Sequence, residues 1–270
     1  MPAERRARGT TRRRKARDRA PTSLTIVGRR PALEAVRSGR AFEVLIAEGT
    51  RSTPGLREVV EAAGASGVTV TTVESERIES LADGALHQGV AARVRSAPAL
   101  TEAALSTRTW GADAIVVVVD GVTDSQNLGA LARTSEAAGA EALIYRRHRA
   151  APIGNVAVKA SAGALLHLPL AEVPNLPRTL DLLKDQRFWV VGLDEGSAST
   201  IYEEAPPGRV ALVLGAEGEG LSRLVRERCD DLVAIPLHGR VESLNVSVAA
   251  GVALFSYAVR GKEKKRTRQE

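Results

Sequence analysis

One stretch constrains the fold of this chain more than any other: Ala114–Val119 is apolar at every position. An uninterrupted apolar run of this length is typical of a strand that is buried on both faces, as in parallel sheets. Asp120-Gly121 then turns the chain, and Leu128–Ala138 carries apolar residues at helical spacing before Gly139 ends that pattern. Strand and helix patterns alternate along the chain, so we predict an α/β fold with a mostly parallel sheet.

The alternation divides into two units, separated where Ser96-Ala97-Pro98 breaks the pattern. In the first unit, a short lead-in at Thr22–Val27 precedes predicted helices at Pro31–Ser38, Leu56–Ala63 and Ile78–Ala82 and predicted strands at Phe42–Ala47, Val68–Val73 and Gly89–Val94. In the second unit, the other predicted strands are Ala142–Tyr145, Phe188–Leu193, Val210–Leu214 and Leu232–Ile235, and the other predicted helices are Val156–Leu165, Leu176–Lys184, Leu221–Arg228 and Val246–Val259. We therefore predict a basic tail at 1–21, a small domain at 22–97, a linker and lead-in at 98–111, a main domain at 112–261 and a basic tail at 262–270.

The net charge of +6 is unevenly placed. Residues 1–19 hold nine Lys or Arg and two acidic residues, which gives +7, and residues 262–270 hold five basic and two acidic residues, which gives +3. The rest of the chain therefore carries −4. Basic tails are typical of arms that bind nucleic acid, and a solubilising extension is the alternative. The charge gives no evidence for a basic surface on the folded core.

Cysteine, histidine and apolar patterns limit the classes of protein to which the chain can belong. Its one cysteine, Cys229, excludes an intrachain disulfide and a cysteine-based zinc site, and its four histidines have no ligand spacing, so we expect no metal. The N-terminus lacks the apolar segment of a secretory signal, and no apolar run reaches the ~18 residues that span a bilayer. We expect a cytoplasmic protein that does not enter a membrane.

Polar residues follow three predicted strands, and ligands bind beyond the carboxyl ends of strands in open α/β sheets. In the first segment, Asn127 can cap the helix that follows, and Gly129 allows a close backbone approach. Arg133 lies six residues after Asn127, within an otherwise apolar helix. If it is buried, its guanidinium needs an anionic or carbonyl partner. The alternative is an ordinary helix cap followed by a surface arginine.

The second segment, Leu214–Gly220, contains three glycines after a strand, so its backbone can touch a ligand closely. It is not a phosphate-binding Walker loop, because the Lys-Ser/Thr pair is missing. Glu217 and Glu219 would repel a phosphate, but they suit a cation or a hydroxyl-rich ligand. A tight turn without a ligand is the alternative.

The third segment begins at Ile235-Pro236 and reaches the last predicted helix through Ser243 and Asn245, either of which can cap that helix. The helix itself is rich in Ala, Val and Gly, which predicts very close packing against a neighbour. A simple capped helix is the alternative, although one capping residue is enough and the second is then unexplained.

In order and spacing, the three segments resemble the three motifs of the SpoU/TrmH group of SPOUT methyltransferases. They read DGVTDSQNLGALART (residues 120–134), LVLGAEGEGL (212–221) and IPLHGRVESLNVSVAAG (235–251), and the resemblance covers residues 112–260. Within that group the chain is most similar to bacterial enzymes that methylate a guanosine ribose in 23S rRNA. Those enzymes begin with a small domain like ribosomal protein L30e, which Gly28–Val94 resembles. The arginine-rich segment before Gly28 lies outside the resemblance.

The resemblance implies an α/β fold with a deep trefoil knot at its C-terminal end, S-adenosyl-L-methionine bound in the knot, and a homodimer whose sites are completed across the interface. It implies methyl transfer to a ribose 2′-hydroxyl of 23S rRNA. The positions that match the family's cofactor site are Leu214, Gly215, Glu217, Gly220, Ile235 and Leu244. The positions that match its catalytic and RNA-contact residues are Asn127, Arg133, Glu217, Ser243 and Asn245.

The roles of these side chains follow from their chemistry. Family proposals have the arginine at Arg133 remove the hydroxyl proton, but a guanidinium stays protonated, so a phosphate clamp that stabilises charge is the easier interpretation. Asn127 and Glu217 would orient the arginine and the target, and Ser243 and Asn245 would hold the loop and the ribose. Other acceptors remain alternatives: another rRNA nucleotide, including one modified for antibiotic self-resistance, or transfer RNA. A non-enzymatic RNA-binding module is the alternative of a different class.

Overall fold

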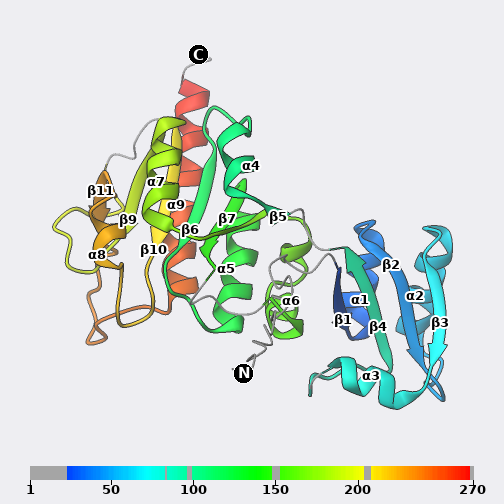
Figure 1. Cartoon of the computed structure of the whole chain (residues 1–270). Helices are drawn as coiled ribbons and strands as arrows, with labels where there is room; N and C mark the ends of the chain where they lie inside the picture. Colours follow the sequence, from blue (N-terminus) through cyan, green and yellow to red (C-terminus); the bar gives the residue numbers. More distant parts are fainter. Residues whose placement is uncertain (1–22, 83, 96–98, 148–152, 204–207, 268–270) are drawn as a thin grey trace, which may run out of the picture.

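The computed structural model describes residues 23–82, 84–95, 99–147, 153–203 and 208–267, with side chains up to residue 258 apart from Asn155. The predicted N-terminal tail and the break at 96–98 lie outside these residues. Two α/β domains follow one another along the chain, a small one and a larger one (Figure 1). The predicted fold class, a parallel-sheet domain preceded by a small α/β domain, is confirmed.

The small domain is built on a four-stranded sheet of order β1-β4-β2-β3. Its elements are β1 (Ser23–Val27), α1 (Arg29–Arg37), β2 (Ala41–Ala47), α2 (Pro54–Ala65), β3 (Thr69–Val73), α3 (Ser75–Ala82) and β4 (Val90–Arg95). The predicted lead-in before Gly28 is a full strand that pairs with β4. Each predicted helix and strand of this unit is present, because each carries a clear apolar period and ends at a turn-forming residue.

The large domain contains a seven-stranded sheet of order β11-β9-β10-β6-β7-β8-β5, in which every pairing is parallel. Its strands are β5 (Ala99–Leu100), β6 (Ile115–Val119), β7 (Ala142–Arg146), β8 (Leu170–Val173), β9 (Phe188–Leu193), β10 (Arg209–Leu214) and β11 (Asp231–Val233). Its helices are α4 (Glu102–Thr107), α5 (Ser125–Ala137), α6 (Asn155–Ala160), η1 (Ala164–Leu166), α7 (Leu176–Asp185), α8 (Arg223–Arg226) and α9 (Val246–Thr267).

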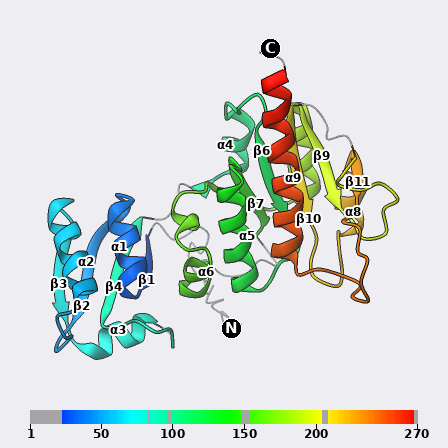
Figure 2. The ribbon, with the colours of Figure 1, turned by 180° about the vertical axis from the view of Figure 1, so that it is seen from behind.

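The apolar run Ala114–Val119 contains β6, which lies in the middle of this sheet. Val117 and Val119 belong to one buried cluster, whereas Val116 and Val118 belong to another. The first cluster includes residues of α5 and α9, and the second includes residues of α4, α7 and α8. Helices therefore cover both faces of the sheet, with α5 and α9 side by side on one face (Figure 2). Full burial of a valine contributes about 1.5–3 kcal/mol, so β6 anchors both layers.

The structure differs from the predicted elements at several places. The segment predicted as a linker contains β5 and α4, and β5 pairs with β8, a strand that was not predicted. These two short strands are too brief to show a period. The single helix predicted over 156–165 is interrupted, because Ala162 and Gly163 have φ values of 47° and 89°. Helix α9 continues to Thr267 and so includes most of the predicted C-terminal tail.

None of the helices in the described part of the chain is long and apolar enough to cross a membrane. Because the strands of the large sheet run in one direction, the carboxyl ends of β6, β9 and β10 lie at one edge. The glycine-rich loop after β10 and the segment that leads into α9 both reach this edge.

Candidate active site

The loop after β10 is held in a tight, closed conformation. The backbone groups of Ala216 and Gly220 exchange two hydrogen bonds, of 3.1 and 2.9 Å, which close the loop on itself. A Cβ atom on Gly215 would overlap the backbone of Gly220, so only glycine fits there. Gly218 and Gly220 have φ values of 79° and 66°, a region that glycine occupies without strain. The sequence pattern predicted this loop because three glycines follow a strand.

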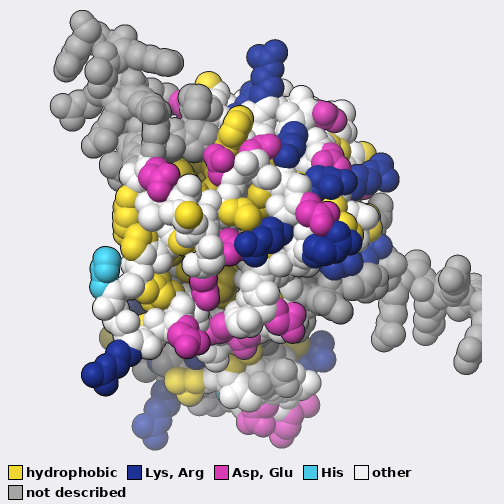
Figure 3. Space-filling model, turned by 90° about the vertical axis from the view of Figure 1, so that its left-hand side faces the viewer, with side chains coloured by type: hydrophobic (Ala, Val, Ile, Leu, Met, Phe, Trp, Pro, Cys, Tyr) yellow, Lys and Arg dark blue, Asp and Glu magenta, His cyan; other side chains and the backbone are white. Residues whose placement is uncertain are grey.

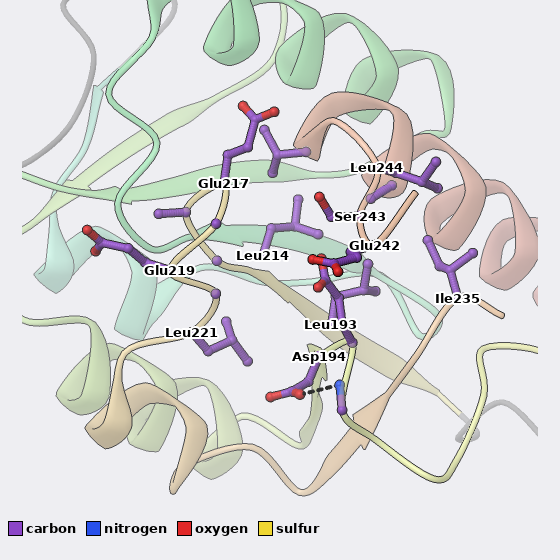
Figure 4. A pocket seen from close by; sticks show the side chains of 18 of the residues that line it. Leu193, Asp194, Leu214, Glu217, Glu219, Leu221, Ile235, Glu242, Ser243 and Leu244 are labelled. Carbon is purple, nitrogen blue, oxygen red and sulfur yellow. Dashed lines mark hydrogen bonds between the residues drawn. The ribbon is translucent and has the colours of Figure 1, made fainter. Parts of the chain in front are cut away.

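A cavity of about 430 Å³ opens at this edge of the sheet, in the size range of small-molecule sites. It lies between the end of β9, the loop after β10 and the segment before α9 (Figure 4). The six predicted cofactor positions all line it: Leu214, Gly215, Glu217, Gly220, Ile235 and Leu244. Leu193 and Leu221 add apolar surface to the same cavity. Apolar side chains and loop backbone thus face the same open cavity.

Strand β9 also contributes to the cavity, which the sequence motifs did not predict. Leu193 ends this strand and Asp194 follows it, and both line the cavity together with Arg226 of α8. Asp194 forms an ion pair with Arg226 and accepts a 3.0 Å hydrogen bond from the Gly196 amide. Its carboxylate is nearly buried, so the ion pair fixes the wall of the cavity. The sequence contains an indication of this contribution, because a polar residue follows β9 directly, as it does after the strands of the three motifs.

Asn127 does not cap α5, contrary to the prediction. Asp124 is the N-cap residue, and its Oδ1 accepts a 2.7 Å hydrogen bond from the Asn127 amide. The helix starts at Ser125, two residues before Asn127, so the Asn127 side chain is free for other partners. Gly129 does permit a close approach, because a Cβ there would overlap the carbonyl oxygen of Ala157 in α6. That approach joins two helices and does not expose backbone to a ligand.

A chain of side-chain hydrogen bonds joins the three segments. Asn127 donates through Nδ2 to Glu217 at 3.4 Å, and its Oδ1 accepts from Nδ2 of Asn245 at 2.9 Å. Asn245 also caps α9, since its Oδ1 accepts from the amide and hydroxyl of Ser247 at 3.0 and 2.6 Å. Three of the five predicted catalytic positions therefore lie in one network, although the sequence separates them widely.

The other two predicted catalytic residues lie outside this network. Ser243 is exposed and lines the cavity; it does not cap α9, because Asn245 has that role. Arg133 is exposed on α5, and it forms no hydrogen bond or ion pair with another residue that the structure describes. It lines neither hollow at this edge. Of the two interpretations left open by the sequence, the surface arginine is the observed one.

A second hollow, of about 400 Å³, lies on the other side of the glycine-rich loop. The two spaces share Ala216, Glu217, Glu219, Gly220 and Val246, so the loop forms a wall between them. The side chains of Glu217 and Glu219 point away from Leu193 and Leu214 in the first cavity (Figure 4). Asp120, at the end of β6, lines the second hollow and accepts a 2.9 Å hydrogen bond from the Ser222 amide.

The surface around α8 and β11 is mixed in charge. Figure 3 views the molecule from this side: acidic side chains lie below the centre, and basic side chains gather toward the right. The face is therefore not uniformly basic, in agreement with the charge distribution along the sequence.

Two family models match the chain. Residues 114–255 match the SpoU rRNA Methylase family, and residues 25–99 match the family described as RNA 2'-O ribose methyltransferase substrate binding. The first match contains the loop, the cavity and the hydrogen-bonded network, and the second covers the small domain.

Individual relatives agree with these matches. The 23S rRNA (guanosine-2'-O-)-methyltransferase RlmB of Salmonella typhimurium is 42% identical over 80% of this chain and 89% of its own length. The enzyme of the same name from Haemophilus influenzae is 44% identical over 80% of this chain and 88% of its own length. The solved structure of the SpoU methyltransferase AviRb from Streptomyces viridochromogenes, in complex with the cofactor AdoMet, covers 88% of this chain and 90% of its own, with 26% identity and a TM-score of 0.74. The chain belongs to the SpoU rRNA methylase family.

Proposed function

We propose that this protein transfers a methyl group from S-adenosyl-L-methionine to the 2′-hydroxyl of a guanosine ribose in 23S rRNA. The observation that carries the proposal is the hydrogen-bonded link from Glu217 through Asn127 to Asn245, beside a cavity lined by loop backbone. The names of the relatives support the acceptor, and a cofactor-bound structural neighbour supports the donor.

The residues of the first cavity fit this cofactor. The lining side chains of Leu193, Leu214, Ile235 and Leu244 supply apolar surface for an adenine ring. Gly215 has no room for a side chain, so its backbone stays accessible at the cavity wall. We infer that the six predicted cofactor positions hold the molecule. When bound, the cofactor would supply a methyl group on a positively charged sulfur; the 2′-oxygen would take the methyl carbon and lose its proton, and the neutral thioether would leave.

The network positions the acceptor hydroxyl. Asn127 is held from both sides, by Glu217 and by Asn245, so its amide has one defined orientation. Glu217 accepts the hydrogen bond from Asn127 in this network. We propose that its carboxylate also accepts the proton that the ribose 2′-hydroxyl loses. Ser243 is placed to contact the ribose or the cofactor from the segment before α9. Arg133 remains charged and serves as a clamp for an RNA phosphate.

Two copies of the chain form the working unit, with each site completed by Arg133 of the other copy. Helix α9 supports this part of the proposal, because Val248, Val252 and Phe255 lie on one side of it at helical spacing. Val248 and Phe255 are 51% and 47% exposed, and an apolar stripe of this kind indicates a covered face. Arg133 lies on α5, the helix that packs against α9.

A mixing experiment tests the shared site. An Arg133→Ala chain and a Gly215→Ala chain are each expected to be inactive. If each site combines the cofactor pocket of one copy with Arg133 of the other, refolding the two chains together restores one site in each mixed dimer, and about a quarter of the normal activity returns. No recovery with dimers present would place Arg133 in the site of its own chain. Phe255→Glu, analysed by sedimentation, tests the dimer itself.

The reaction is tested by transfer of labelled methyl from the cofactor to unmodified 23S rRNA, followed by mapping of the labelled nucleotide. A single 2′-O-methylated guanosine is expected. Labelling of a different rRNA nucleotide, or of transfer RNA only, would show that the proposed acceptor is wrong and that the proposed reaction is right. No transfer to any RNA, with intact RNA binding, would indicate a binding module. The small domain is proposed to bind this RNA, and the cytoplasm, where ribosomes are assembled, is the proposed location.

The trefoil knot implied by the resemblance also stays a proposal. It is supported by the way the loop after β10 and the segment before α9 approach each other around one cavity at the end of β9.

A further inference from the structure

The second hollow contains an arginine to which no role has been assigned. Arg146 is the last residue of β7 and is half-buried at the wall of the hollow. Its side chain has no hydrogen bond or ion pair with another described residue. The next residue, Arg147, is different: it is exposed, lies outside both hollows and pairs with Glu172 at 3.3 Å. The strand end thus presents one of two neighbouring arginines to the hollow.

The charges around Arg146 indicate what it binds. Four carboxylates line the same hollow: Asp120, Asp124, Glu217 and Glu219. One arginine among four carboxylates disfavours a phosphate group, because the phosphate would be repelled. A neutral ligand that offers hydrogen-bond donors on one edge and acceptors on another suits this lining better.

Three of the four carboxylates already have protein partners. Asp120 accepts from the Ser222 amide, and Asp124 accepts from the Asn127 amide. Glu217 holds Asn127. Glu219 lines both hollows, has no side-chain hydrogen bond or ion pair to another described residue, and its side chain points away from Leu214 (Figure 4). Arg146 and Glu219 are therefore the two charged groups of the hollow whose side chains have no partner among the described residues.

Guanine is the nucleobase that matches this pair. Its O6 and N7 atoms form an acceptor pair that arginine binds with two hydrogen bonds, and its N1–H and N2 amino group form a donor edge that suits a carboxylate. Adenine and cytosine lack the O6/N7 pair, and uracil lacks the amino donor. We propose that Arg146 and Glu219 bind the guanine base of the acceptor nucleotide in the second hollow. This inference rests on the proposed function.

The position of the hollow agrees with that role. It shares Asn127 and Glu217 with the hydrogen-bonded network, so a nucleotide with its base in the hollow has its ribose beside those groups. The shared loop then separates the base from the cofactor cavity. Its volume of about 400 Å³ falls within the range of small-ligand sites.

The test uses RNA hairpins that contain the mapped acceptor site, made with guanosine, 7-deazaguanosine or inosine at that position. 7-Deazaguanosine lacks N7, and inosine lacks the 2-amino group. Hairpin affinity without cofactor and single-turnover methylation are measured for the unaltered chain and for Arg146→Ala, Glu219→Ala and the control Arg147→Ala. The control removes the same charge from a neighbouring position outside the hollow.

The unaltered chain and the control should bind the 7-deazaguanosine hairpin about 10-fold more weakly than the guanosine hairpin. Arg146→Ala should bind both equally while it still discriminates against inosine. Glu219→Ala should show the opposite pattern, losing only the inosine effect. Because each variant loses discrimination against a different analogue, the comparison shows which side chain contacts which edge of the guanine base.

Two results would overturn the inference. One is undiminished discrimination against 7-deazaguanosine in Arg146→Ala. The other is that Arg146→Ala loses affinity equally for all three hairpins and that its affinity depends less on salt. That result would show that Arg146 contacts a phosphate. If the unaltered chain methylates none of the mapped hairpins and no rRNA, the proposed function has failed, and this outcome is distinct from a failure at Arg146.

Discussion

The side-chain nitrogen of Asn245 donates a 2.9 Å hydrogen bond to the side-chain oxygen of Asn127, across 118 positions of the sequence. Because that oxygen accepts, the Asn127 nitrogen faces Glu217, and the orientation of the amide is defined. The same Asn245 caps α9 through its oxygen. One asparagine therefore joins the start of a helix to the catalytic network, which allows the two roles to be separated experimentally.

Asn245→Asp should keep the helix cap and break the network. An aspartate oxygen can still accept from Ser247, but it cannot donate to Asn127. We expect stability within about 0.5 kcal/mol of the unaltered protein and a roughly 100-fold slower single-turnover methylation, because Asn127 loses its defined orientation. Asn245→Ala should be equally slow and also lose about 1 kcal/mol, measured by urea unfolding. Full activity in Asn245→Asp would remove the link to Asn127 from the mechanism.

Gly215→Ala should abolish cofactor binding. The added Cβ would overlap the backbone of Gly220, so the loop that separates the two hollows has to move. Overpacking of this kind usually costs about 1–3 kcal/mol of stability. The matched control is Gly239→Ala, in the segment before α9, where a Cβ would have nothing within 4 Å. Calorimetric titration with cofactor should give no binding for the first variant and unchanged affinity for the second; equal affinities would contradict the assignment of the cavity.

Arg133→Ala should abolish methyl transfer while cofactor binding is largely kept. Because the side chain is exposed and has no partner among the described residues, its removal should change stability by no more than about 0.5 kcal/mol. Activity, cofactor affinity and unfolding are measured on the same preparation. Loss of cofactor binding with normal turnover at saturating cofactor would show that the assignment is wrong.

Removal of residues 1–19 should weaken RNA binding, most strongly at low salt. This segment carries a net charge of +7. Each phosphate contact that is lost reduces the slope of log affinity against log salt by about 0.7–0.9. The measurement is hairpin affinity at several salt concentrations, with cofactor affinity as the control for an intact large domain. An unchanged slope would identify the segment as a solubilising extension.

Cys229 should be unreactive in the folded protein. Its thiol contacts the carbonyl of Val225 at 3.4 Å, and burial raises the pKa of the thiol to about 12, against an ordinary value of 9.0. At pH 8 the thiolate fraction is then about 1,000-fold lower than in the unfolded chain, so alkylation by iodoacetamide should slow by a similar factor. Labelling is unambiguous, because the chain has one cysteine.

The same pKa shift affects stability at alkaline pH. Between about pH 9 and pH 12 the unfolded chain loses the thiol proton while the folded chain keeps it, so the unfolded state binds fewer protons and stability falls as pH rises. Below pH 9 this group contributes no pH dependence. Cys229→Ala should therefore reduce the fall in stability between about pH 9 and pH 12. In the alkylation experiment, equal rates for folded and unfolded protein would contradict the burial of the thiol.

The central strands and long helices of the fold could be predicted because their own residues carry the signal. Val116–Val119 is apolar at every position, since it packs against helices on both sides. Strand β5 could not be predicted, because Ala99–Leu100 is held by pairing with β8 and has no period of its own. The break at Ala162 depends on a left-handed backbone that the sequence pattern does not announce.

The sequence by itself determined the glycine-rich loop and the polar residues that follow strands, because these depend on residue type at short range. Only the tertiary structure decided that Asp124, one helical turn earlier, caps α5 and leaves Asn127 for Glu217 and Asn245. It also decided that Arg133 is exposed and that Arg146 lines the second hollow. These outcomes depend on which strand ends lie side by side in a parallel sheet, and contacts between residues so distant in the chain leave no local pattern.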